Sequence, residues 1–161
     1  MTVVATETDQ STEAATASVS RLGVSIGAQY WLIDLSEAGE ILPLPDAVTA
    51  VPSTKGWFKG IANLRGELFG VSDLGVFQGE KPTQLGKDAR LVALSGALGV
   101  NAAILVSKMM GLQNMDGMTR DEAVAAKGWA GKVWIDSSGT HWRELSLAGL
   151  ARDQEFLSVN R

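Results

Sequence analysis

Apolar residues alternate with polar or small ones where the regular pattern of this chain begins. Leu22, Val24 and Ile26 follow the period of two that is typical of a strand with one buried face. Residues 27–29 supply a turn, and the β-rich run 30–33 returns as a second strand. The pattern therefore opens on a pair of short strands, and we expect the folded structure to begin near Leu22.

The next patterns also predict strands. The run 41–44 contains Pro43, and because proline cannot donate to a ladder, we predict an edge strand or one that ends early. Residues 61–71 hold two apolar runs around Arg65 and Gly66, which predicts a hairpin whose glycine supplies a positive φ.

The second half of the chain continues in the same way after a polar stretch at 80–89, which we interpret as a loop between two lobes. The predicted strands are 91–94, 100–106, 132–135 and 141–145, and the last two form a hairpin. Residues 109–118 look irregular, 119–128 are expected to form a long loop, and Ser146 is a candidate N-cap for a closing helix. Short strands separated by many of the 18 glycines indicate small barrels, so the predicted class is all-β.

The first 20 residues differ in composition from the rest. They contain Glu7, Asp9 and Glu13, and they have no Lys, Arg, aromatic residue, glycine or proline. Such a segment cannot bury enough apolar surface to offset its ordering entropy. We therefore expect a disordered tail over residues 1–20 and a folded domain over residues 21–161.

Charge and apolar content exclude several classes of protein. Beyond residue 20 the chain carries 14 basic and 15 acidic residues, without the basic face that nucleic-acid binding requires. No apolar run approaches the ~20 residues that span a bilayer, and the N-terminus lacks the features of a signal peptide. We expect a cytoplasmic protein that neither binds nucleic acid nor inserts directly into a membrane.

The sequence offers no catalytic constellation. It has no cysteine and a single histidine, His141, and a lone histidine at a strand start is more often structural or solvent-facing than catalytic. No nucleophile elbow, phosphate-binding loop or metal-ligand spacing is present. The carboxylates Asp73, Asp136 and Glu144 each stand in apolar or turn surroundings, and the sequence does not show the pair that acid–base hydrolysis needs. We therefore expect no enzymatic activity, no metal and no cofactor.

Tryptophan and arginine side chains offer binding features instead. Most of the five tryptophans are expected in the core or between lobes, although one or two partly exposed ones could anchor a partner. Arg65, at the hairpin apex, has two interpretations. It is either a solvated turn charge or an exposed anchor that Asn63 and Gly66 direct, and a planar guanidinium suits the second because it can bind a carboxylate at two points.

One long motif brings these features together. Residues 57–74 read WFKGIANLRGELFGVSDL, and this run resembles the signature of the CheW-like family of chemotaxis coupling proteins. Upstream, residues 40–43 and 51–52 match two further elements of the family, an acidic residue before a hydrophobic pair and a Val-Pro. The resemblance covers roughly residues 21–157 and is highly specific around Asn63-Leu64-Arg65-Gly66.

The resemblance implies a fold of two SH3-like five-stranded β-barrels packed side by side, with a short C-terminal helix. On this interpretation the first lobe covers about residues 29–89. The second lobe covers about 21–28 and 90–161, and the first strand and the C-terminal helix help to complete it.

The resemblance also implies a function. It predicts a non-enzymatic adaptor that binds the CheW-like regulatory domain of a histidine kinase and the cytoplasmic tip of a chemoreceptor, and is thereby recruited to the inner face of the membrane. Within the family, residues 33–41, 57–63 and 142–147 are most similar to the coupling proteins of type IV pilus (twitching motility) systems. The alternatives are a coupling protein of a flagellar or other chemosensory pathway, a regulatory module of a receiver-bearing protein, and a small-molecule enzyme. We do not expect a receiver domain within this chain, because the stretch after residue 157 is too short for one. We do not favour an enzyme, because the sequence shows no catalytic constellation.

Six residues match family positions and are our candidate partner-binding residues: Arg65, Asn63, Gly66, Gly60, Glu40 and Asp73. By resemblance, Arg65 matches the arginine tied to receptor and kinase coupling, and the two glycines shape its hairpin. The chain departs from the family pattern in two places. Gly70 stands where relatives have proline, and Ser107-Lys108 stands where they have an aspartate before a basic residue.

Overall fold

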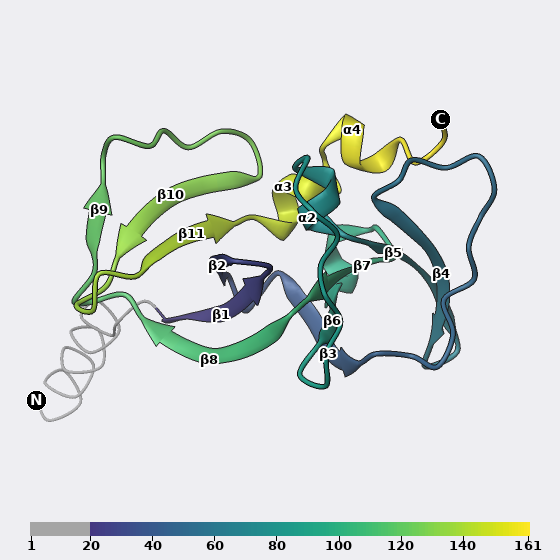
Figure 1. Cartoon of the computed structure of the whole chain (residues 1–161), viewed down its shortest axis with the longest axis horizontal. Helices are drawn as coiled ribbons and strands as arrows, with labels where there is room; N and C mark the ends of the chain where they lie inside the picture. The colour runs from purple at the N-terminus through teal and green to yellow at the C-terminus, as the bar shows by residue number, and fades with distance from the viewer. Residues whose placement is uncertain (1–19) are drawn as a thin grey trace, which may run out of the picture.

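The computed structural model describes residues 20–161, which form two β-sheets that lie side by side (Figure 1). The five-stranded sheet makes the first lobe, in the order β3 (Ala38–Pro43), β6 (Arg90–Leu94), β7 (Ala102–Val106), β5 (Glu67–Ser72), β4 (Phe58–Leu64). The six-stranded sheet makes the second lobe, in the order β8 (Lys108–Asn114), β1 (Ser20–Ile26), β2 (Gln29–Ile33), β11 (His141–Leu145), β10 (Ala130–Ile135), β9 (Thr119–Asp121). The helical elements are short: α2 (Leu74–Phe77), η1 (Gly96–Leu98), α3 (Leu147–Ala151) and α4 (Gln154–Leu157). The all-β prediction is confirmed.

The predicted boundary between the lobes was wrong. Residues 29–33, assigned to the first lobe, form β2 and pair with β1 and β11 in the second. Residues 90–106, assigned to the second lobe, form β6 and β7 of the first. The cause is a parallel pairing between β5 and β7, which keeps both sides of the 80–89 loop in one sheet.

Other local predictions had mixed outcomes. β3 is an edge strand, as Pro43 predicted. The stretch expected to be irregular instead contains β8, which pairs with β1 around a bulge where Gly111 has a φ of 80°. β1 begins at Ser20, the last residue of the predicted tail, and the rest of that tail lies outside the described residues.

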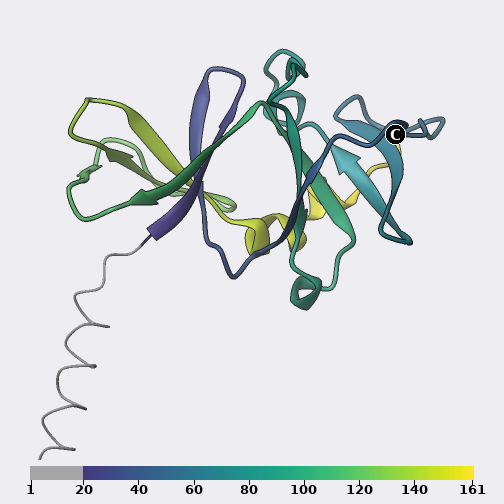
Figure 2. The same ribbon diagram turned by 90° about the horizontal axis from the view of Figure 1, so that it is seen from below.

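The C-terminal segment joins the two lobes. Ser146 caps α3 as predicted, because its Oγ accepts a hydrogen bond of 2.8 Å from the Gly149 amide. The expected single helix is two short ones, and the chain runs through them from the second lobe to the first (Figures 1 and 2). α3 lies against the second lobe, where the Ser146 amide donates to the carbonyl of Trp129 at 2.8 Å, whereas α4 and the end of the chain lie on the first lobe. The amide of Lys55 donates to the carbonyl of Val159 at 2.8 Å, so the end of the chain is fastened to the first lobe.

Two apolar cores stabilise this arrangement. The smaller core belongs to the first lobe alone and includes Leu64, Val71 and Leu105. The larger one contains residues of β1, β2, β6, β7 and the C-terminal helices, and so it unites the lobes. Within it, the rings of Trp57 and Phe156 stack with their centroids 5.6 Å apart. Because this shared core is continuous, we expect the lobes to keep a fixed relative orientation.

Candidate protein-interaction site

The hairpin between β4 and β5 presents Arg65 at its tip. Leu64 pairs with Glu67, so Arg65 and Gly66 form a two-residue turn. Their φ values are 53° and 86°, as a type I′ turn requires. The Asn63 side chain stabilises this turn, because its Oδ1 accepts a 2.9 Å hydrogen bond from the Gly66 amide. The predicted hairpin is confirmed, with the addition that Arg65 also adopts a left-handed conformation.

The side chain of Arg65 is 73% exposed and forms an ion pair. Its Nε lies 2.9 Å from Oε2 of Glu40, on β3. The structure therefore brings four of the six candidate residues together, and the ion pair ties the hairpin tip to the opposite edge strand of the sheet. An exposed ion pair of this kind contributes about 0–1 kcal/mol, so a partner's carboxylate could replace Glu40 at little cost.

Two exposed apolar side chains flank this ion pair along the chain. Ile41 follows Glu40 on β3 and is 43% exposed, and Leu68 lies on β5 beyond the turn and is 63% exposed. We call the group Glu40, Asn63, Arg65 and Leu68 the Arg65 surface; Ile41 is left out because its side chain lies on the opposite face of β3 from that of Glu40. Neither apolar residue was singled out from the sequence. The signal was available for Leu68, because a two-residue turn places it opposite the polar Asn63.

Gly60 has a structural position. It is buried, its φ is 136°, and a Cβ there would lie 2.1 Å from the carbonyl oxygen of Thr49. Next to it, Ile61 and Thr49 exchange backbone hydrogen bonds of 2.8 and 2.9 Å. Only a glycine lets the segment before β4 cross the strand this closely. Gly60 therefore shapes the lobe, and its prediction as a partner contact is corrected.

The prediction that Asp73 contacts a partner is also corrected, because only 1% of this residue is exposed. Its carboxylate accepts hydrogen bonds from the amides of Gly75 and Val76, and so caps α2. It also accepts from the Thr83 amide at 2.8 Å and from the Thr83 Oγ1 hydroxyl at 2.6 Å. Asp73 thus fastens the 80–86 loop to the end of β5, and a buried carboxylate with this many donors is a scaffold element.

Both departures from the family pattern have a local role. The Gly70 amide donates to the carbonyl of Asn101 at 3.0 Å, a bond that a proline could not make. A Cβ on Gly70 would also come within 2.9 Å of the Phe58 ring. Ser107 accepts a 2.9 Å bond from the Gly27 amide through its Oγ, which fastens the β1–β2 turn.

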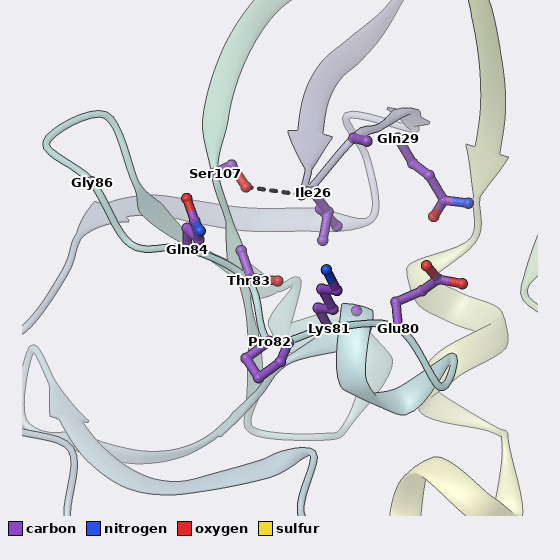
Figure 3. A pocket seen from close by; sticks show the side chains of 12 residues that line it. Ile26, Gln29, Glu80, Lys81, Pro82, Thr83, Gln84, Gly86 and Ser107 are labelled. Atoms are coloured by element: carbon purple, nitrogen blue, oxygen red, sulfur yellow. Dashed lines mark hydrogen bonds between the residues drawn. The ribbon is translucent and has the colours of Figure 1, made fainter.

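An open cavity of about 590 Å³ separates the β1–β2 turn from the 80–86 loop. In Figure 3 the side chains of Glu80 and Lys81 extend from the loop toward Gln29 and Ile26 of the other lobe. The cavity mixes apolar, amide and oppositely charged groups, and nothing in its lining selects one kind of ligand.

The remaining candidates have structural or solvent-facing positions. Trp31, Trp57 and Trp142 are buried, and Trp129 and Trp134 are partly exposed, as expected. The His141 side chain is 60% exposed, with its Nε2 3.9 Å from Asp121. Over residues 20–161, no three His, Asp or Glu side chains gather as a metal site would require. None of the helices in this part of the chain is long and apolar enough to cross a bilayer.

The chain is similar to known proteins in both sequence and fold. Residues 21–155 match the family model described as the CheW-like domain. The chain is 31% identical over 145 residues to Protein PilI of Pseudomonas aeruginosa, covering 88% of this chain and 80% of that protein. The crystal structure of the scaffolding protein TtCheW from Thermoanaerobacter tengcongensis matches with a TM-score of 0.65 and 18% identity, over 80% of this chain and 88% of that one. This likeness confirms the predicted fold of two SH3-like barrels side by side, although the sheet of the second lobe has six strands and not the five expected.

Proposed function

Because this chain belongs to the CheW-like family, we propose that it is a non-enzymatic adaptor that couples a chemoreceptor to a histidine kinase. We further propose that the system it serves controls type IV pili. The similarity to PilI supports this pathway over a flagellar one. In this role the chain works in the cytoplasm and reaches the membrane through the receptor.

The Arg65 surface supports this proposal at the level of residues. It combines an exposed arginine with the exposed apolar side chain of Leu68, and arginine is enriched among the residues that dominate binding energy. Glu40 engages Nε of Arg65. The contact leaves the Arg65 side chain 73% exposed, with its two terminal nitrogens outside this ion pair. They can therefore bind a partner carboxylate at two points.

We assign the Arg65 surface to the CheW-like regulatory domain of the kinase. Such a contact buries Leu68. It also lets the Arg65 guanidinium bind a partner carboxylate in place of Glu40 or together with it. The Asn63 hydrogen bond within the turn and the Glu40 ion pair support this assignment, because a preorganised surface loses little entropy when it binds.

The pathway is tested by deleting the gene for this chain from its host and measuring twitching and swimming separately. We expect twitching to be lost and swimming to be kept, and the intact gene to restore twitching. Loss of swimming alone would assign the chain to a flagellar pathway. Co-purification of the tagged chain with a histidine kinase tests the coupling role, and an untouched kinase activity in the deletion strain would contradict it.

A further inference from the structure

A hollow smaller than the 590 Å³ cavity lies in the first lobe, at the end away from the Arg65 turn. It has a volume of about 350 Å³ and lies near the start of β4, whereas Arg65 follows the end of that strand. Its floor is buried apolar core from β5 and β7, and the 44–48 and 82–85 segments form its walls. We call it the Lys59 cup; its apolar lining comprises Leu44, Pro45, Val48, Val71, Pro82, Leu85 and Leu105.

Among the polar groups that line the cup, only the charge of Lys59 is available to bind a ligand. Asp73 and Thr83 line it as well, but their oxygens and the Thr83 amide are bonded to each other or to the start of α2. Lys59 is exposed, and it is the remaining charged residue in the lining. The cup therefore offers an apolar interior with a single ammonium group beside it.

The rim of the cup also exposes apolar surface to water. Leu85 is 50% exposed although it belongs to the cup lining. Covering such a side chain contributes on the order of 25 cal/mol per Å² of apolar surface removed from water. An occupant that reaches from the floor over Leu85 gains more than one that fills the floor alone.

We propose that the Lys59 cup binds a segment of a partner protein that inserts a bulky apolar side chain and places a carboxylate against Lys59. The volume is ample for one aromatic side chain or two aliphatic ones, within the range of ligand pockets. The single positive charge selects an acidic flank over a basic one. A chain segment, unlike a small molecule, extends over the exposed rim. This surface is separate from the Arg65 surface and does not depend on it.

The proposal is tested with a short probe and the full chain. The blocked tripeptide Glu-Phe-Glu is titrated into ¹⁵N-labelled protein, with Lys-Phe-Lys and decanoate as the comparison ligands. We expect Glu-Phe-Glu to shift the amides of Lys59, Val48, Leu85 and Leu105, with a Kd of about 1 mM for so small a ligand. Lys-Phe-Lys should bind at least about tenfold more weakly.

A charge exchange makes the test specific. Lys59→Glu should weaken Glu-Phe-Glu by about tenfold or more and should strengthen Lys-Phe-Lys. Lys132→Glu, an exposed lysine on β10 of the other lobe, changes the net charge equally and should leave both affinities within about twofold. Leu85→Gln should weaken both peptides.

Three outcomes would overturn the proposal. They are shifts confined to residues outside the cup, equal effects of the two lysine variants, and tighter binding of decanoate than of the acidic peptide, which would assign the cup to a lipid. All variants lie at exposed positions, and their amide spectra report whether the fold is kept.

Discussion

Arg65 and Asp73 belong to one 18-residue motif, yet the structure gives them opposite surroundings. Arg65 sits on a turn with its side chain 73% exposed and one ion pair to Glu40. Asp73 is 1% exposed and receives bonds from Gly75, Val76 and Thr83. The motif therefore specifies both an interaction surface and the scaffold that holds it. Substitutions in the two places should separate binding from stability.

The largest effect is expected at the scaffold. Asp73→Ala removes the α2 cap and leaves the buried donors of Thr83 without an acceptor, which should lower the free energy of unfolding by about 3 kcal/mol or more. Urea denaturation measures it. Thr83→Val is the matched control, because it removes only the hydroxyl bond, and it should cost about 1–2 kcal/mol. An Asp73→Ala protein of normal stability would break the distinction between scaffold and surface.

The second largest loss of stability is expected from a substitution at Gly60. Gly60→Ala places a methyl group against the Thr49 carbonyl at a φ of 136°, so the free energy of unfolding should fall by about 2 kcal/mol. Gly56 has open space around it and no positive φ, and Gly56→Ala should leave stability within about 0.5 kcal/mol of the original. Equal midpoints for the two alanine variants would show that the close crossing at Thr49 is absent.

A substitution at Glu40 should change stability only slightly, in contrast to one at Asp73. Glu40→Gln breaks an exposed ion pair, so stability should change by less than about 1 kcal/mol. The change in the urea midpoint should shrink further in 1 M salt, because salt screens exposed charges. A large, salt-independent loss of stability would mean that the pair with Arg65 is a scaffold contact.

The contact between Arg21 and Asp34 lies between these two extremes. Hydrogen bonds from Ser36, followed by Arg21, hold the pKa of Asp34 below its ordinary value. A carboxyl whose pKa is depressed by folding stabilises the protein above the ordinary aspartate range, and the contribution is lost as the pH falls through the folded value. Asp34→Asn should therefore be less stable than the original at pH 6, and the gap should narrow as the pH falls below the ordinary aspartate range. A gap that is constant with pH would contradict this assignment.

The local part of this architecture could be predicted from the sequence. The hairpin at Arg65 follows from two apolar runs around a glycine, and Asn63 and Gly66 act on the turn as expected. Its contact with Glu40 could not be predicted, because β3 and β4 lie at opposite ends of the strand order. Only closure of the lobe brings them together.

The division into lobes depends on pairings that local patterns do not encode. The parallel pair of Gly70 with Ala102 and that of Ile33 with Leu145 join distant segments. A polar loop looks the same in sequence whether it separates two lobes or connects two strands of one sheet. The role of Asp73 was missed for a similar reason, since its partner Thr83 lies within that loop.

The most direct test of the Arg65 surface is a calorimetric titration with the isolated regulatory domain of the kinase. Arg65→Ala should weaken binding by about 2 kcal/mol, roughly 30-fold, if this arginine dominates the interface. Its melting temperature should stay within about 2 °C of the original, and Arg152→Ala, at an exposed arginine after α3, should bind normally. An unchanged affinity for Arg65→Ala would contradict the assignment of this surface to the kinase.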